Sequence, residues 1–399
     1  MKVYHINTVY NMGSTGRIAA QLKHTLETQG DECVVAYGRG FSEENNTFKI
    51  GTKIDLYFHA LMSRITDKTG MYSKRNTRRL IKNIIQFNPD VIHLHNLHGY
   101  YLNIELLFNF LKKYNKPVVW TLHDCWAFTG HCAYYSTSGC DKWKTLCKEC
   151  SQRRNYPSSY FTDNSKNNFL QKKELFTSIL RMTLVTPSFW LKREVEQSFL
   201  GKYDIKCIYN GIDTKVFKPT NGILRKQYGL ESKKIVLGVA SLWSERKGLQ
   251  DFYKLAEILP DEYRIVMVGV DEKKAKQMPA NIICIEKSDS QEVLAGLYTE
   301  ADVYFNASVE ETMGLTTIEA MACGTPVVVY NKTAVPEVVD ESVGRIVEPG
   351  NIEEVKSAIE DVVLINNIGE KCVQYANKYC MKKQYGEYMD LYKKICGNE

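Results

Sequence analysis

The 399-residue sequence has no apolar run long enough to cross a lipid bilayer, which takes about 18 to 20 uninterrupted apolar residues. Its longest apolar stretches, such as 235–240, have the length of single β-strands. The first residues contain one lysine and then polar residues and glycines, without the apolar core and small-residue cleavage site of a signal peptide. We therefore expect a chain that is made and kept in the cytoplasm.

Other patterns are missing as well. The sequence has no short-period repeat and no low-complexity segment. Its 12 cysteines are too dilute for a disulfide scaffold. A hydrophobic fraction of 44% and a charged fraction of 25% exclude a disordered chain, a collagen-like fibre and a coiled-coil rod. The length predicts two domains.

Positive charge is concentrated in the first half of the chain. Residues 1–200 contain 27 Lys/Arg and 16 Asp/Glu, whereas residues 201–399 contain 25 and 30. The asymmetry indicates that the N-terminal half faces an anionic membrane, a phosphorylated substrate or nucleic acid, unless it serves solubility alone. No nucleic-acid-binding motif accompanies the charge, so we do not expect nucleic acid as a partner.

Strand-like and helix-like segments alternate in two series, which predicts an α/β fold with two doubly wound, Rossmann-like domains facing across a cleft. We place the N-terminal domain at 1–205, with a cysteine-rich irregular insertion at about 129–172, and the C-terminal domain at 206–375. A helix at 376–399 is expected to cross back to the N-terminal domain. Ligands of such sheets bind beyond the carboxyl ends of the strands, so the loops that follow strands are the ones to inspect.

Residues 307–329 carry the strongest chemical signal. Glu310 and Glu311 lie in a loop after a strand, and Gly314 opens a helix. Helix N-termini offer unpaired N–H groups and a positive dipole to a phosphate, here through Gly314, Leu315 and Thr316. Glu319, one turn further on, can accept from ribose hydroxyls, and Glu311 can reach a sugar.

Glu311 and Glu319 are separated by seven residues and are followed by Ala320, Ala322, Gly324, Pro326 and Val327. This pattern resembles the signature of retaining glycosyltransferases of family four, which have the GT-B architecture of two facing Rossmann-like domains. The alternative is an ordinary strand–loop–helix with surface glutamates. Residues 208–219 also resemble the family's interdomain turn.

Residues 239–252 resemble the family segment in which a basic residue before a glycine clamps the donor diphosphate. The resemblance implies that role for Arg246 and Lys247. Many members have an arginine five residues before the lysine, where this chain has Leu242. The alternative is a solvated helix start.

In the N-terminal domain, the resemblance places the Gly13–Gly16 loop against the donor phosphates and the acceptor, with Gly13 and Gly16 as donor-binding residues. It places His123 in the sugar-binding cleft as a catalytic residue beside Glu311. Asp124 and His98 are assigned to the acceptor side. His93 and His95 invite a metal interpretation, but the family usually needs no divalent metal, so we expect no catalytic metal.

The cysteine cluster suggests a different kind of site. Cys132, Cys140, Cys147 and Cys150 lie in the irregular insertion. In a reducing cytosol this spacing is compatible with a structural tetrathiolate zinc site, in which His131 or Cys125 could replace one ligand. The alternative is a set of small buried hydrophobic side chains.

Residues 74–85 combine five Lys/Arg with four apolar side chains and predict a basic amphipathic helix. Such a helix can contact an anionic membrane surface, or it can simply pack on the sheet. A membrane contact would make the protein peripheral on the inner face of the membrane.

The resemblance implies a retaining transfer of a hexose or N-acetylhexosamine from a nucleotide diphosphate sugar to a saccharide acceptor. A UDP-sugar is favoured and a GDP-sugar is possible. The whole chain is most similar to bacterial transferases of capsular, colanic-acid or O-antigen polysaccharide, whose acceptors are lipid-linked oligosaccharides. The alternatives are a sugar-nucleotide epimerase on the same fold and a catalytically inactive scaffold subunit.

Overall fold

The computed structural model describes residues 1–397 and divides into two compact units. Unit 1 comprises residues 1–209 and the C-terminal segment from Tyr385, and unit 2 comprises residues 210–384. The division at 209/210 lies four residues beyond the expected 205/206. The returning segment starts at Tyr385, within the expected helix 376–399.

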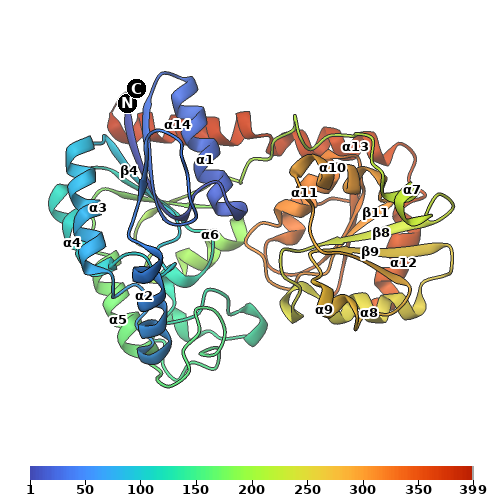
Figure 1. Cartoon of the computed structure of the whole chain (residues 1–399), viewed down its shortest axis with the longest axis horizontal. Helices are drawn as coiled ribbons and strands as arrows, with labels where there is room; N and C mark the ends of the chain where they lie inside the picture. Colours follow the sequence, from blue (N-terminus) through green and yellow to red (C-terminus); the bar gives the residue numbers. More distant parts are fainter. Residues whose placement is uncertain (398–399) are drawn as a thin grey trace. The chain divides into compact units, whose positions relative to one another are not determined.

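Unit 1 is built on a seven-stranded parallel sheet in the order β3-β2-β1-β4-β5-β6-β7. Its strands are β1 (Lys2–Val9), β2 (Glu32–Arg39), β3 (Thr47–Lys49), β4 (Val91–Leu94), β5 (Val118–Thr121), β6 (Met182–Thr186) and β7 (Asp204–Cys207). Its main helices are α1 (Gly13–Thr28), α2 (Lys53–Thr66), α3 (Lys74–Phe87), α4 (Ile104–Tyr114), α5 (Ser165–Phe176) and α6 (Phe189–Glu196). Figure 1 labels its strand β4 and its helices α1 to α6. Strands β1, β4 and β5 are almost fully buried, as expected where helices cover both faces of a parallel sheet.

Helix α14 (Met381–Cys396) closes unit 1 through tyrosines. The Tyr392 hydroxyl lies 2.5 Å from His93 Nδ1, and the Tyr388 hydroxyl lies 3.1 Å from Thr121 Oγ1. Tyr385 donates a hydrogen bond to Gln21 on α1. The chain's last helix is therefore part of the core of unit 1.

Three details of unit 1 differ from the sequence-based expectation. The glycine loop at 13–16 is already the first turn of α1, because Gly13 enters the helix with φ of +61°. The irregular insertion ends at residue 164 rather than 172, because α5 begins at Ser165. The short edge strand β3 was not predicted.

The basic helix predicted at 74–85 is α3, and part of its apolar face is buried, although Ile85 is 53% exposed. Leu80 and Ile84 are fully buried in the core of unit 1, while Arg78 and Arg79 are exposed. For Leu80 and Ile84 the structure therefore supports the second of the two alternatives, packing on the sheet.

Unit 2 has a six-stranded parallel sheet in the order β10-β9-β8-β11-β12-β13. The strands are β8 (Lys234–Val239), β9 (Tyr263–Val268), β10 (Ile282–Ile285), β11 (Val303–Asn306), β12 (Val327–Tyr330) and β13 (Gly344–Val347). Its helices are α7 (Leu224–Tyr228), α8 (Leu249–Ile258), α9 (Glu272–Ala275), α10 (Gln291–Glu300), α11 (Leu315–Ala322), α12 (Ile352–Val362) and α13 (Ile368–Ala376). Strand β13, at the edge of the sheet, was not predicted.

Both units are thus doubly wound, as the alternation of segments predicts. Within residues 1–397, none of the helices combines the length and the apolar character needed to span a bilayer.

Candidate active site

In each sheet the strand order reverses beside the first strand, between β1 and β4 in unit 1 and between β8 and β11 in unit 2. Loops that leave the carboxyl ends of the strands on either side of such a point diverge and leave room for a ligand. The sequence-predicted site residues fall in these loops or in the loop after β5. Each unit therefore presents its candidate residues at its own switch point.

In unit 2, Lys247 follows β8 and Glu311 follows β11, and the structure joins them in a hydrogen-bonded ion pair between Nζ and Oε1. Both side chains are about one-fifth exposed. Burial alone would raise the pKa of Glu311, but the adjacent Lys247 and Arg246 outweigh it and lower the pKa. Glu311 is therefore a carboxylate at neutral pH.

The two loops that carry this pair are held close together. The Val309 N–H donates to the Arg246 carbonyl at 3.0 Å, and Arg246 NH1 donates to the Glu310 carbonyl at 2.7 Å. Gly248 has φ of +71°, and a Cβ there would lie 2.3 Å from the Cβ of Ala307. Glycine at 248 thus permits the close approach that places two cations beside Glu311.

Helix α11 begins directly after this loop. Gly314 precedes it with φ of +83°, a conformation that favours glycine. The first turn of a helix leaves N–H groups without an intrahelical acceptor, here including those of Leu315 and Thr316. The Thr316 hydroxyl accepts from Tyr304 at 2.8 Å, so a buried strand residue orients this first turn.

Glu319 lies on the second turn of α11 and is 6% exposed, which does not fit the alternative of a surface glutamate. Its Oε2 accepts a hydrogen bond of 3.3 Å from the Tyr298 hydroxyl. A buried carboxylate is costly unless it is hydrogen-bonded or paired, so this contact helps to stabilise Glu319 in its buried position. Sequence reasoning missed the supporting Tyr298 and Tyr304, because only the fold brings α10 and β11 behind α11.

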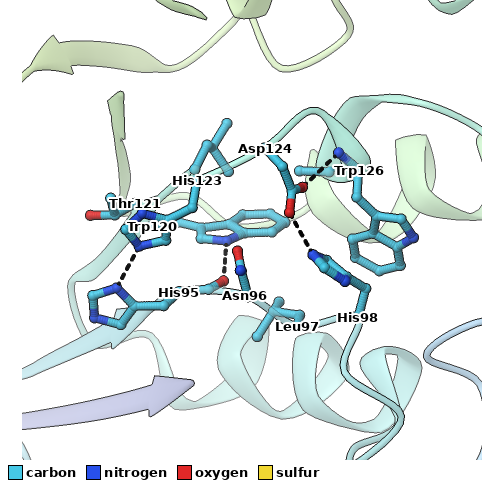
Figure 2. A pocket seen from close by; sticks show the side chains of 11 residues that line it. His95, Asn96, Leu97, His98, Trp120, Thr121, His123, Asp124 and Trp126 are labelled. Carbon is cyan, nitrogen blue, oxygen red and sulfur yellow. Dashed lines mark hydrogen bonds and ion pairs between the residues drawn. The ribbon is translucent and has the colours of Figure 1, made fainter. Parts of the chain in front are cut away.

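In unit 1, a small pocket forms where β4 and β5 end, and the predicted acceptor-side residues meet there (Figure 2). His98 Nε2 lies 2.7 Å from Asp124 Oδ2, and Asp124 Oδ1 accepts from the Trp126 N–H. Burial would raise the pKa of Asp124, but the contact with His98 outweighs it and lowers the pKa. Asp124 thus remains ionised and fixes the ring of His98.

His123 lines the same pocket and ends a chain of three buried histidines. Its Nε2 lies 3.1 Å from His95 Nδ1, and His95 Nε2 lies 3.0 Å from His5 Nδ1 (Figure 2 shows the first contact). Burial lowers the pKa of His123 to about 4 and that of His5 to about 3, so both rings are neutral at pH 7.

His5, at the other end of this series of hydrogen-bonded histidines, indicates which ring nitrogens carry the protons. His5 Nε2 is buried and has no hydrogen-bond partner among residues 1–397. Orphaned buried N–H groups are rarer than orphaned acceptors, so the proton of His5 belongs on Nδ1, from which it donates to His95. His95 then donates from Nδ1 to His123 Nε2. This leaves His123 with its own proton on Nδ1, as a neutral hydrogen-bond donor.

The ligand atoms of His5, His93 and His95 lie within 4.8 Å of one another, but they do not fit a metal ion. Both ring nitrogens of His93 are engaged, with Tyr392 and with Thr121, and both of His95 are engaged with histidines. Only His5 Nε2 remains, and one nitrogen does not make a site.

Comparison with known proteins decides the family. The sequence profile of Glycosyltransferase Family 4 matches residues 15–216, and that of glycosyl transferases group 1 matches residues 221–379. The chain belongs to glycosyltransferase family 4. It is 25% identical to the putative colanic acid biosynthesis glycosyl transferase WcaC of Escherichia coli K12, over 99% of this chain and 100% of that protein.

Other relatives of this family 4 glycosyltransferase include the O-antigen chain mannosyltransferase RfbU of Salmonella typhimurium, 24% identical over 58% of this chain and 66% of that protein. Among solved structures, sucrose-phosphate synthase of Thermosynechococcus elongatus has a TM-score of 0.73 at 14% identity and covers both chains fully. HepE of Anabaena in complex with UDP has a TM-score of 0.69 at 15% identity, over 99% of this chain and 100% of that one. These neighbours confirm the GT-B fold.

The glycosyltransferase's predicted residues thus form two groups. Arg246, Lys247, Glu311, Gly314, Leu315, Thr316 and Glu319 gather at the switch point of unit 2, and His98, His123 and Asp124 line the pocket of unit 1. Gly13 and Gly16 lie in the first turn of α1, after β1. A Cβ at Gly16 would lie 3.0 Å from Val9 Cγ2, so this glycine lets the helix pack on the strand end.

Proposed function

We propose that this glycosyltransferase transfers a hexose or N-acetylhexosamine, with retention, from a nucleotide diphosphate sugar to a saccharide acceptor. The observation that carries the proposal is the Lys247–Glu311 pair beside the N-terminus of α11. The complex of HepE with UDP makes a UDP-sugar the favoured donor, with a GDP-sugar as the second choice.

In this proposal the diphosphate binds at the switch point of unit 2. Lys247 and Arg246 neutralise it, and they also stabilise the charge that grows on the leaving diphosphate as the glycosidic bond breaks. The N–H groups of Leu315 and Thr316 bind a phosphate oxygen. Lys247 gives up part of its contact with Glu311 to bind the phosphate. Glu311 then accepts hydrogen bonds from sugar hydroxyls, and Glu319 accepts hydrogen bonds from the ribose hydroxyls.

Retention follows from attack on the same face that the diphosphate leaves. The acceptor hydroxyl oxygen forms the new bond to the anomeric carbon, the bond to the diphosphate breaks, and the departing phosphate oxygen takes the hydroxyl proton. No pair of catalytic carboxylates of the glycosidase type is required. A neutral His123 with its proton on Nδ1 can donate to a hydroxyl of the transferred sugar without adding charge.

We assign the acceptor to unit 1, where His98 and Asp124 line the pocket. The names of the relatives, colanic acid biosynthesis and O-antigen chain transfer, support a lipid-linked oligosaccharide of a surface polysaccharide as the acceptor. Such an acceptor would bring the enzyme to the membrane surface.

Helix α2 offers unit 1 a face for that contact. Ile54, Tyr57, Phe58 and Leu61 are 80%, 70%, 58% and 56% exposed, and Ile65 continues the same stripe. Spacings of three and four residues place all five on one side of the helix. Exposed cations flank the stripe at Lys53, Arg64 and Lys68. An apolar, aromatic face flanked by cations suits an anionic bilayer interface.

The stripe extends beyond α2. The Tyr160 N–H donates to the Arg64 carbonyl, and the Thr162 hydroxyl donates to the Ile65 carbonyl, so residues 160–162 lie against the end of the helix. Phe161 between them is 74% exposed. Contiguous exposed apolar patches of this kind mark interaction sites. We therefore assign peripheral membrane binding to α2 with residues 160–161, instead of to α3.

Titration of nucleotide sugars and free nucleotides by calorimetry tests the donor proposal, with Glu311→Ala and Lys247→Ala beside the wild type. We expect one nucleoside diphosphate sugar to bind, and Lys247→Ala to abolish the binding. If no nucleotide sugar binds to the folded protein, with or without a lipid-linked acceptor, the donor assignment fails and a scaffold role takes its place.

A further inference from the structure

The cysteine-rich loop between β5 and α5 encloses a cavity that the transferase chemistry does not use. Residues 129–164 contain only two single turns of 3-10 helix, at Ser136–Ser138 and Lys142–Lys144. Cys132, Cys140, Cys147 and Cys150 all line one cavity in this loop, together with His131 and Trp143. All four cysteines are free thiols.

Unsatisfied polar atoms gather around this cavity. Eight buried side-chain N or O atoms lack a hydrogen-bond partner within the described 1–397, and three of them belong to residues that line it. They are His131 Nε2, Trp143 Nε1 and Ser165 Oγ. Buried polar groups are normally paired, so this concentration indicates that a polar ligand belongs in the cavity.

His131 is oriented as a metal ligand. Its Nδ1 lies 2.5 Å from Asp67 Oδ1, and both side chains are 1% exposed. A neutral imidazole that donates from Nδ1 to a carboxylate carries its lone pair on Nε2, the atom left without a partner. Metal-binding histidines commonly have this carboxylate behind them, because it fixes the ring and increases its basicity.

A buried basic side chain beside the cavity is also compatible with an anionic group of thiolates and metal inside it. Lys172 on α5 is 1% exposed, and its Nζ donates to the carbonyls of Trp126 and Thr129. Its Nζ also lies 3.5 Å from the centroid of the Trp126 ring. No ion pair of Lys172 within 4.0 Å is found among residues 1–397, although a buried ammonium is costly without a counter-charge. Burial lowers the pKa of Lys172 to about 7, and negative charge on the Cys147 and Cys132 sulfurs would raise it again.

We propose that this cavity is a structural zinc site in which His131 Nε2 and three of the four cysteine thiolates bind one Zn²⁺. One Zn²⁺ with three thiolates and one neutral imidazole has a net charge of −1, and this negative charge would favour the protonated form of Lys172. A site of three cysteines and one histidine is a common structural set for zinc. This is the alternative of the sequence-based set in which His131 replaces one cysteine.

The metal would also order the loop. Cys132 and Cys150 are in hydrogen-bonding contact. Among the described residues, however, the group of three metal donors that lie within 4.8 Å of one another is His5, His93 and His95, and not a group of the cavity. The cavity donors must therefore draw together to reach zinc–sulfur distances of about 2.3 Å. Binding then stabilises a segment that has little regular structure of its own.

The first test is the metal content of the whole protein, purified without chelator and then reconstituted with one equivalent of Zn²⁺. We expect about one zinc per chain, released by a thiol-specific mercurial reagent. Replacement by Co²⁺ should give thiolate-to-cobalt charge-transfer absorption and the visible bands of a tetrahedral ion. Zinc below about 0.2 per chain after reconstitution, or a cobalt spectrum without thiolate bands, would overturn the proposal.

Variants then test the ligand set. His131→Gln should weaken zinc binding at least about 100-fold in competition with a chelator, and Asp67→Asn, behind the ligand, by about 10- to 100-fold. Cys284→Ser in unit 2, a half-buried cysteine far along the chain, should change nothing. If His131→Gln binds zinc like the wild type, the assignment of His131 fails. Should these variants not fold, the wild-type stoichiometry and cobalt spectrum still decide the proposal.

Discussion

The two units share one architecture but present opposite chemistry at their switch points. Unit 2 places an ion pair and a second cation there, in Lys247, Glu311 and Arg246. Unit 1 places neutral rings, because burial lowers the pKa of His95 and His123 well below 7. All eight histidines of the chain lie between residues 5 and 131, and unit 2 contains none.

Under the proposed function, this difference would adapt one fold to two ligands. A diphosphate is an anion, and fixed cations in a partly desolvated loop bind it and its growing charge. Sugar hydroxyls are neutral, and a ring held in one tautomer can donate to them without the desolvation cost of a buried charge. The same sheet thus carries charge recognition in one unit and hydroxyl recognition in the other.

The largest expected effect is a loss of stability at low pH that affects unit 1 and not unit 2. His5, His59, His93, His95 and His123 all have a pKa in the folded state below the unfolded value of about 6.5. Below pH 6.5 the unfolded chain takes up more protons, so the stability of unit 1 is full above that pH and falls as the pH decreases. At pH 5.5 the loss is about 1.4 kcal/mol for each histidine, or several kcal/mol in all.

Amide hydrogen exchange at pH 7.5 and 5.5, corrected for the intrinsic rate, measures this loss. We expect faster exchange at low pH in peptides of β1 and β4 and little change in those of β8 and β11. Protein treated with chelator serves as the control, since it removes any contribution from metal. An equal loss of protection in both units would contradict the assignment of neutral, buried histidines to unit 1.

The next effect tests the charged switch point. Lys247→Ala removes a diphosphate contact and leaves Glu311 without its partner, and we expect kcat/KM to fall about 10³-fold, equivalent to about 4 kcal/mol. Steady-state kinetics with the preferred donor measures the fall. Lys254→Ala, which removes an exposed lysine on α8, is the matched control and should stay within about two-fold of the wild type. Similar kinetics for both variants would show that Lys247 does not bind the donor.

The third effect concerns the exposed apolar stripe of α2, which we propose as the membrane contact of unit 1. Replacing Phe58 and Leu61 by Asp should reduce sedimentation with anionic vesicles about 100-fold, because each buried side chain contributes about 1.5–3 kcal/mol. Leu180→Asp introduces the same charge at another exposed position of unit 1 and should bind like the wild type. Unchanged sedimentation of the double variant would exclude α2 as the membrane contact.

The sequence predicted the fold of unit 2 and residues that the structure brings together there, and the reason is physical. Strand–helix alternation is sufficient to specify two parallel sheets, and Gly248 and Gly314 stand where φ is positive, so local residues report the loop geometry. Glu311 and Lys247 are 64 residues apart, yet both follow strands at one switch point, so topology alone brings them together.

Unit 1 was less predictable, because its chemistry depends on contacts that no local pattern reports. Asp67 and His131 are 64 residues apart and meet only through the packing of the cysteine-rich loop. Likewise, the sequence predicted an amphipathic helix at α3, but not which of its apolar side chains the sheet would cover, and it did not predict the exposed apolar stripe of α2. Only the structure shows Leu80 buried and Tyr57 exposed.

The smallest expected effect refines the charged side of the comparison. Tyr304→Phe removes the hydroxyl that donates to Thr316, so the first turn of α11 loses one constraint, and we expect donor affinity to fall about three- to ten-fold, in line with one hydrogen bond. Tyr263→Phe, at the amino end of β9 and away from the site, is the matched control and should leave the affinity unchanged. If calorimetry finds the same affinity for both variants and the wild type, the orientation of Thr316 does not contribute to phosphate binding. The backbone of α11 would then be sufficient for this contact.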